Sequence, residues 1–190
     1  MKDKERTSTP AKKGPEGKDK LIKIHKKGDR GQTRLLSGEK VSKSSLRIEV
    51  CGNLDESNAF MGLAKAYTDN QEIRSIISTI QQDLFVVAAE LASTDQRPNA
   101  KRIELEQISR LEQWITHLQE EAPLAHCFVE PGANAVSAAL DLARTVIRRT
   151  ERSMVMLQET GQLQRAEVLK YVNRLSCLFY TLARYAEKLP

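Results

Sequence analysis

Apolar residues recur at three- and four-residue spacing from residue 53 to the end of the chain, which is the period of an amphipathic α-helix. Proline, glycine, asparagine and aspartate interrupt the pattern between its regular stretches. The most regular stretch has an inward-facing set of Ile73, Ile76, Ile77, Ile80, Leu84, Val87, Ala88 and Leu91. The pattern predicts helices over residues 53–67, 71–93, 103–120, 134–158 and 163–188.

Five amphipathic helices with short connections predict an all-α fold, a five-helix bundle. For the first helix we expect an N-terminal cap at Asn53 or Asp55. The side chains expected to face inward in that helix are Phe60, Leu63, Ala64 and Tyr67. The second, fourth and fifth helices are long and apolar enough that we also expect burial against neighbouring subunits.

The chain before residue 53 divides into two parts. Residues 1–20 contain no large aliphatic side chain apart from Met1, so they cannot bury enough apolar surface to fold. We therefore expect a disordered tail over 1–20 and one domain over 21–190. Residues 21–52 show no helical period and predict a loop.

That loop carries two glycines among cationic and hydroxyl side chains. The relevant residues are Lys26, Lys27, Gly28, Arg30, Gly31, Thr33 and Lys43. Glycine lets backbone N–H groups approach an anion, and the cations neutralise its charge, so the segment predicts a phosphate-binding loop. An ordinary basic surface loop remains the alternative, because the P-loop pattern is absent.

The charge distribution argues against nucleic-acid binding. The net charge is +5, but residues 1–23 hold eight Lys/Arg and four Asp/Glu, which leaves only +1 for residues 24–190. A general polyanion binder would have a basic body as well as a basic tail. We therefore expect no nucleic-acid partner.

Several other classes of site are disfavoured. Cys51, Cys127 and Cys177 are odd in number and lack CxxC spacing, which indicates a reducing compartment and no structural zinc. The histidines show no HxxxH or HExxH spacing, so no metal site is predicted. No apolar run approaches the roughly 18 residues of a membrane span, and no signal-peptide core is present. These features predict a cytoplasmic protein without a membrane partner.

Residues 141–152, DLARTVIRRTER, place charged side chains on one face of the fourth helix. At about 100° per residue, the side chains that share this face are Asp141, Arg144, Arg148, Glu151 and Arg152. The stretch from Arg144 to Arg152 spans about 12 Å, the length of an extended triphosphate. A solvated face with ordinary i,i+3 and i,i+4 ion pairs is the alternative.

Four segments together resemble the ATP:cob(I)alamin adenosyltransferases of the propanediol-utilisation and human mitochondrial type. KGDRGQTRLLSGEKVSK is similar to the family's TGDxGxT…GxR…K loop, and CGNLDESNAFMGLA to its GTxDELNSxIG segment. FVEPG followed by LARTVIRRTER resembles FxLPGG and ARxxxRRAER, and YVNRLSCLFYTLARYA resembles YLNRLSDxLFxLARYA. The segments occur in the family's order and extend over nearly all of the chain after residue 24.

The resemblance implies a homotrimer with active sites at the subunit interfaces and an N-terminal nucleotide-binding loop. By position, the residues matching the family's ATP contacts are His25, Lys26, Lys27, Gly28, Thr33, Arg34, Lys43, Arg148, Arg149, Thr150, Glu151, Arg152 and Asn173. Asp55 and Arg144 match a pair that bridges the interface beside the corrinoid, and Phe128 matches the aromatic that displaces the corrinoid's lower ligand. Arg148, Asp55, Arg144 and Phe128 are therefore the expected catalytic residues.

The implied reaction transfers the 5′-deoxyadenosyl group of ATP to cob(I)alamin and releases triphosphate. Its substrates are ATP with Mg²⁺ and cobalamin, with K⁺ as a further candidate ion. The candidate protein partners are a cobalamin reductase and an adenosylcobalamin-dependent enzyme.

The chain departs from the family pattern at four places. His25 and Lys27 stand in place of threonines, Glu130 lies within the segment that matches LPGG, and Cys177 replaces an aspartate. These departures leave open a degenerate paralogue that binds ATP or adenosylcobalamin for delivery or sensing without efficient catalysis. A third alternative is a structural bundle whose arginine face docks a partner.

Overall fold

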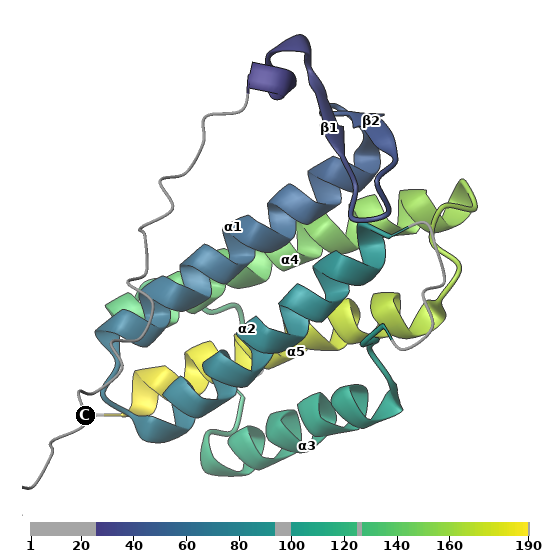
Figure 1. Ribbon diagram of the computed structural model, residues 1–190. Helices are drawn as coiled ribbons and strands as arrows, with labels where there is room; N and C mark the ends of the chain where they lie inside the picture. Colours follow the sequence, from purple (N-terminus) through teal and green to yellow (C-terminus); the bar gives the residue numbers. More distant parts are fainter. Residues whose placement is uncertain (1–25, 94–99, 125–126, 190) are drawn as a thin grey trace, which may run out of the picture.

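A computed structural model describes residues 26–93, 100–124 and 127–189 of the protein (Figure 1). The expected tail over residues 1–20 and the candidate ligand His25 lie outside these residues. The elements in chain order are the 3-10 helix η1 (Lys26–Arg30), strands β1 (Gln32–Arg34) and β2 (Lys40–Ser42), and helices α1 (Leu46–Tyr67), α2 (Gln71–Leu91), α3 (Leu105–Glu121), α4 (Ala135–Glu159) and α5 (Ala166–Lys188). The predicted all-α fold with five helices is confirmed.

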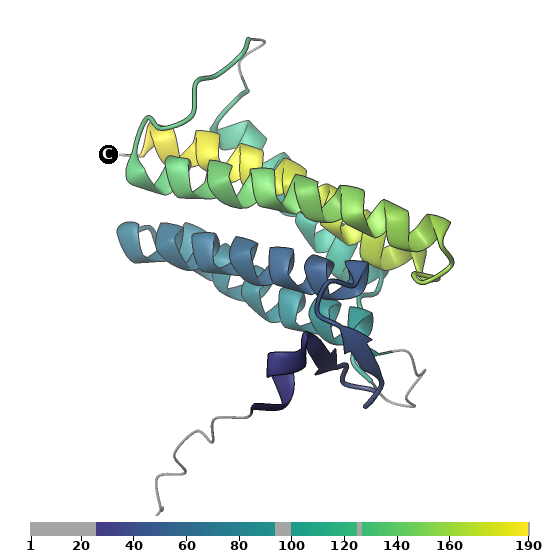
Figure 2. The same ribbon diagram turned by 90° about the horizontal axis from the view of Figure 1, so that it is seen from above.

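The helices form two layers, with α1 and α2 in one and α4 and α5 in the other (Figure 2). Helix α4 packs along α1 and α5, while α3 covers the outer side of α5 (Figure 1). Within the described part of the chain, no helix is long and apolar enough to cross a bilayer.

Helix α5 is the most deeply buried helix of the bundle. Tyr171 and Phe179 on this helix are fully buried. The Tyr171 hydroxyl donates to Asp83 Oδ2 on α2 at 3.0 Å, and Arg110 on α3 pairs with the same carboxylate oxygen at 2.5 Å. Burial, together with the neighbouring Asp83 carboxylate, raises the pKa of Tyr171 well above its usual value, so the phenol stays protonated. These contacts tie α2, α3 and α5 together.

The predicted inward face of α2 is buried except for Ala88, which is half-buried. Asn70 begins this helix, because its side chain accepts a hydrogen bond from the backbone N–H of Ile73 at 2.9 Å. Asn134 begins α4 in the same way, accepting from the N–H of Ser137 at 2.8 Å. These capped starts agree with the predicted ones to within a residue.

The prediction for the first helix was wrong in two respects. Helix α1 begins at Leu46, not at residue 53, so Asn53 lies inside the helix. Leu63 and Tyr67 are 42% and 62% exposed, not inward-facing. The reason is that the buried face of α1 includes the polar side chains Asn53 and Ser57. A prediction based on the spacing of apolar residues does not assign these two positions to the buried face.

Replacing Leu111 by alanine should lower the free energy of unfolding by about 2–5 kcal/mol, because this fully buried α3 side chain would leave a cavity. The matched control is Leu105→Ala on the same helix, where the side chain is 65% exposed and the change should stay within about 0.5 kcal/mol. Thermal or urea unfolding at a fixed protein concentration measures both. Equal losses would contradict the burial of α3 against α5.

Candidate functional site

Helix α4 carries three exposed arginines, and their environments differ. Arg149 reaches across to α1, where its Nε donates to Asn53 Oδ1 at 3.1 Å and its Nη2 pairs with the Glu56 carboxylate. Arg148 and Arg152 have no hydrogen-bond or ion-pair partner among the residues that the structure describes. Two guanidinium groups one helical turn apart are therefore free to bind an anion.

The predicted charged face of α4 is only partly exposed. The sequence places Asp141 on the charged face of this helix, opposite the core, but the side chain is buried, at 4% exposure, because α5 packs over it. Arg144 and Glu151 are half-buried. The exposed cationic surface is thus shorter than the sequence suggested and is confined to the C-terminal half of α4.

Two of the predicted ATP-binding residues meet between α4 and α5. Asn173 Nδ2 donates to Glu151 Oε1 at 2.7 Å. Arg174 holds the other side of this amide, because its Nη1 donates to Asn173 Oδ1 at 2.8 Å while its Nε donates to Glu112 on α3. The polar pair therefore has a fixed orientation beside the free arginines.

Thr150 has a different environment from its charged neighbours. Its side chain is fully buried, and its hydroxyl donates to the carbonyl oxygen of Val146 at 3.0 Å. The structure therefore does not bring this hydroxyl to the exposed face of α4 with Arg148 and Arg152.

The N-terminal loop forms a small antiparallel hairpin, in which Thr33 pairs with Val41. Lys43 closes the loop: its backbone N–H donates to Gly31 O at 2.9 Å, and a Cβ placed on Gly28 would lie only 3.0 Å from its Nζ. Gly31 has a φ of 71°, a conformation that glycine adopts without strain. Gly28, Gly31 and Lys43 therefore lie close together in this loop, and phosphate binding there stays a prediction.

Two other predicted ATP-binding residues of the loop, Lys26 and Arg34, make no side-chain hydrogen bond or ion pair with Gly28, Gly31 or Lys43 among the described residues. Lys26 is exposed, and Arg34 folds back so that its Nη1 donates to Gly38 O at 2.8 Å. The hairpin is fastened to the end of α2 by a hydrogen bond from Leu36 N to Ala92 O at 2.9 Å. No hydrogen bond or ion pair among the described residues joins the loop to Arg148 or Arg152 of the same chain.

The candidate corrinoid residues are separate within one protomer. Asp55 is exposed on α1, while Arg144 on α4 donates from Nε to Asp141 Oδ1 at 3.0 Å. Phe128, in the connection before α4, is fully exposed at 106%. No ion pair between Asp55 and Arg144 occurs in the described part of the protomer.

The Cys51 thiol lies one turn before Asp55 and is half-buried. Burial raises the pKa of Cys51, and the Asp55 carboxylate raises it further against the opposing effect of Arg47. The thiol therefore stays protonated near neutral pH, and Cys51 is a poor nucleophile.

Sequence reasoning missed three residues that shape this site. Asn53 and Glu56 hold Arg149, and Arg174 holds Asn173. The predicted helix over 53–67 already included Glu56 but treated Asn53 as a candidate cap; the contacts of both with Arg149 depend on the packing of α1 against α4, which no local pattern reveals. Arg174 directly follows Asn173 in the sequence, but its role depends on Glu112 of α3.

Known proteins share much of this sequence. Residues 23–186 match the family model described as cobalamin adenosyltransferase. The chain is 39% identical over 163 residues to a corrinoid adenosyltransferase of Bacillus subtilis (strain 168), covering 84% of this chain and 83% of that protein. It is 38% identical over 159 residues to the corrinoid adenosyltransferase PduO of Salmonella typhimurium (strain LT2), covering 83% of this chain but only 47% of that longer protein.

A solved structure also shares the fold. A variant of a PduO-type ATP:corrinoid adenosyltransferase from Lactobacillus reuteri, complexed with cobalamin and ATP, superposes with a TM-score of 0.79 at 33% identity, over 86% of this chain and 92% of the other. The family model covers the loop, the arginine helix and nearly all of α5, and the chain therefore belongs to the cobalamin adenosyltransferase family.

Proposed function

We propose that this protein transfers the 5′-deoxyadenosyl group of ATP to cob(I)alamin, giving adenosylcobalamin and triphosphate. The observation that carries the proposal is that Arg148 and Arg152, whose guanidinium groups have no partner among the described residues, lie beside the fixed Glu151–Asn173 pair. They occur in a chain that matches the cobalamin adenosyltransferase model over residues 23–186.

The triphosphate of ATP would lie along the C-terminal half of α4. Guanidinium groups suit phosphate oxygens because their N–H donors match the oxygens in pairs. Arg148 and Arg152 supply that charge, while Glu151 and Asn173 supply oriented polar atoms next to it. Arg149 contributes by fixing α4 against α1.

The phosphate loop would reach this arginine face from a neighbouring subunit. Within one protomer the described contacts do not connect the loop with Arg148 or Arg152. The apolar side chains exposed on α4 are Leu142, Val155 and Met156 at 46%, 37% and 54%. Exposed apolar residues beside a charged site fit a face that another copy covers, which supports the homotrimer that the family resemblance implies.

The chemistry needs alignment and charge stabilisation more than acid–base catalysis. The electron pair of Co(I) forms the bond to C5′ of the ribose, and the C5′–O bond breaks with its electron pair leaving on the triphosphate. The cationic loop and Arg148 hold the negative charge that develops on the leaving group. This arrangement stabilises the transition state because the charges are in place before the bond breaks.

Magnesium would enter the site with ATP. In the part of the chain that the structure describes, no three His, Cys, Asp or Glu side chains are grouped to hold a metal ion. The phosphate oxygens are the ligands that Mg²⁺ prefers, and the ion would add positive charge at the leaving group. Whether the reaction also requires K⁺ can be tested by measuring adenosylation with and without this ion.

The corrinoid would bind at the other part of the interface. Asp55 is exposed and unpaired in the described protomer, so its carboxylate is available to Arg144 of a neighbouring subunit. The exposed ring of Phe128 offers cobalt no ligand atom, so it would displace the lower ligand and leave four-coordinate Co(II) that is easier to reduce. A reductase would then supply the electron, and an adenosylcobalamin-dependent enzyme would take the product.

A cytoplasmic location is proposed on the state of the cysteines. Cys51, Cys127 and Cys177 are all free thiols, as expected in a reducing compartment.

The direct test measures the loss of cob(I)alamin absorbance when ATP and Mg²⁺ are added under reducing conditions. Conversion to adenosylcobalamin supports the proposal. ATP binding without conversion would favour the degenerate paralogue, whose marks include the exposed Cys177 one turn from Asn173. Absence of ATP binding would favour a structural bundle.

Replacing Arg148 by alanine should lower kcat/KM for ATP by about 10- to 100-fold, because a charge-assisted contact to phosphate is lost. The thermal midpoint and the oligomeric state should not change, because the guanidinium has no partner among the described residues. Steady-state kinetics and size-exclusion chromatography measure these effects. Arg102→Ala, which changes an arginine outside α4, is the control, and near-normal kinetics of the Arg148 variant would remove this residue from the site.

Replacing Phe128 by alanine should impair formation of four-coordinate Co(II) more than it impairs ATP binding, because the ring no longer excludes the lower ligand. Absorbance or electron paramagnetic resonance of enzyme-bound cob(II)alamin with ATP measures the first effect, and calorimetry measures the second. Phe85→Ala is a matched control, because Phe85 is also well exposed, at 65%, but lies on α2. Equal losses of both properties would assign Phe128 a packing role.

A further inference from the structure

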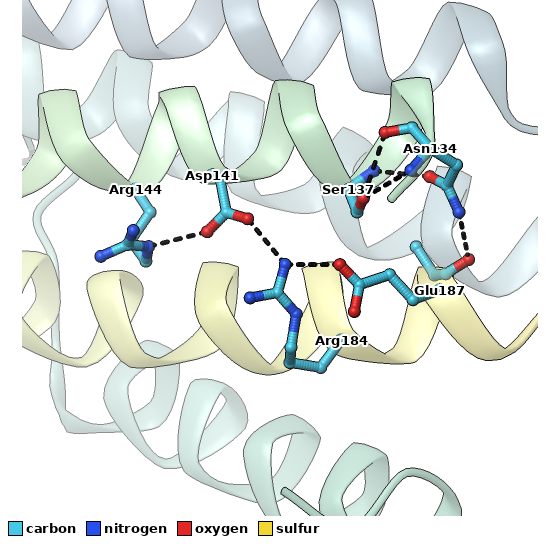
Figure 3. A network of polar contacts seen from close by, with 7 residues as sticks. Asn134, Ser137, Asp141, Arg144, Arg184 and Glu187 are labelled. Atoms are coloured by element: carbon cyan, nitrogen blue, oxygen red, sulfur yellow. Dashed lines mark hydrogen bonds and ion pairs between the residues drawn. The ribbon is translucent and has the colours of Figure 1, made fainter. Parts of the chain in front are cut away.

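A buried ion network joins α4 to α5 (Figure 3). Asp141 lies between two arginines: its Oδ1 accepts from Arg144 Nε at 3.0 Å, and its Oδ2 accepts from Arg184 Nη2 at 2.7 Å. Arg184 also pairs with Glu187 at 2.7 Å. The side chains of Arg184 and Asp141 are 8% and 5% exposed, so water screens this pair only weakly.

Arg184 and Arg144 differ in burial and in the number of their ion pairs. Arg184 is buried, and Asp141 and Glu187 raise its pKa despite the opposing effect of burial, so it stays charged. Arg144 is 25% exposed and is held only through Nε, which leaves both of its terminal nitrogens without a partner among the described residues. The Tyr180 ring lies against both guanidinium groups, with centroid distances of 5.9 Å to Arg144 and 5.2 Å to Arg184.

In this geometry Asp141 holds the Nε of Arg144 and leaves its two terminal nitrogens available to a ligand. An arginine side chain has several rotatable bonds, so a free Arg144 would sample many orientations. The hydrogen bond to Asp141 and the cation–π contact with Tyr180 limit the orientations that Arg144 can sample. Its terminal nitrogens are directed away from the buried carboxylate (Figure 3). Asp141 itself is restrained from the opposite side by Arg184.

We propose that Asp141, held in place by Arg184, is a positioning residue that orients the Arg144 guanidinium toward the corrinoid side of the subunit interface. The inference rests on the proposed function, in which Arg144 lies beside the corrinoid. Asp141 touches neither substrate and acts through Arg144.

A purely stabilising role explains this ion network less well than the positioning of Arg144 does. Buried ion pairs often stabilise a fold no more than well-packed apolar residues of the same volume would. Arg184 Nε is moreover buried without a hydrogen-bond partner in the described structure, so the network is not arranged to satisfy every polar atom. The orientation of Arg144 is the property that apolar side chains could not reproduce.

Asp141→Asn tests the proposal in the full-length protein. The amide keeps the size of the side chain but loses the charge that holds both arginines. We expect the KM for cob(I)alamin to rise about tenfold, as for the loss of one charge-assisted hydrogen bond, while the KM for ATP stays within about twofold. In an Arg144→Ala background, Asp141→Asn should cause no further rise, because its effect passes through the missing guanidinium.

Asp83→Asn is the matched control. Asp83 is also a buried carboxylate paired with an arginine, but it lies on α2 and contacts Arg110 and Tyr171 instead of α4. It should lower the thermal midpoint without changing the ratio of the two KM values. A similar change of this ratio in the Asp83 and Asp141 variants, or full additivity of Asp141→Asn with Arg144→Ala, would overturn the proposal.

A second variant keeps the test decisive if Asp141→Asn fails to fold. Arg184→Lys keeps the positive charge but is shorter and lacks the terminal Nη2 that contacts both Asp141 and Glu187, so we expect a selective rise of about threefold in the cob(I)alamin KM. An unchanged KM would overturn the inference. Wild-type protein that does not adenosylate cob(I)alamin would instead contradict the proposed function itself, so the two failures are distinguishable.

Discussion

The packing of α4 between α1 and α5 determines which charges of this protein can meet a ligand. One side of α4 is apolar and buried, as in any amphipathic helix. The charged side is divided by the neighbouring helices, because α5 covers Asp141 while Arg148 and Arg152 extend beyond that cover. The same helix thus supplies a buried ion network at one end and free guanidinium groups at the other.

The two kinds of charge have different physical roles. A buried, paired charge holds its partner in a fixed geometry, since low dielectric makes both the attraction and the loss of a partner large. An exposed charge without a protein partner remains available to an anionic ligand. In this chain Asp141 and Arg184 are of the first kind, and Arg148 and Arg152 are of the second. Arg144 and Arg149 are intermediate: each is partly exposed and forms an ion pair, Arg144 with Asp141 and Arg149 with Glu56.

Much of the fold could be predicted because the helices obey simple periodicity. The apolar pattern located α2 and α4 closely, and in the structure side-chain caps at Asn70 and Asn134 begin these helices. The start of α1 could not be found in this way, because its buried face includes Asn53 and Ser57. Ser57 is tolerated there because its hydroxyl donates to Ala143 O at 3.3 Å on α4, a partner that no local pattern reveals.

The sequence by itself determined the family, the helical architecture and the identity of the candidate ligands, because each depends on residue types at fixed local spacing. Only the tertiary structure decided which charged residues are free. Asp141 and Arg148 share one helical face in the sequence, yet one is buried against Arg184 and the other has no partner within the described residues. The physical reason is that a helical wheel specifies direction around one axis, whereas burial depends on which side chains of the neighbouring helices lie over each residue, as Arg184 of α5 lies against Asp141.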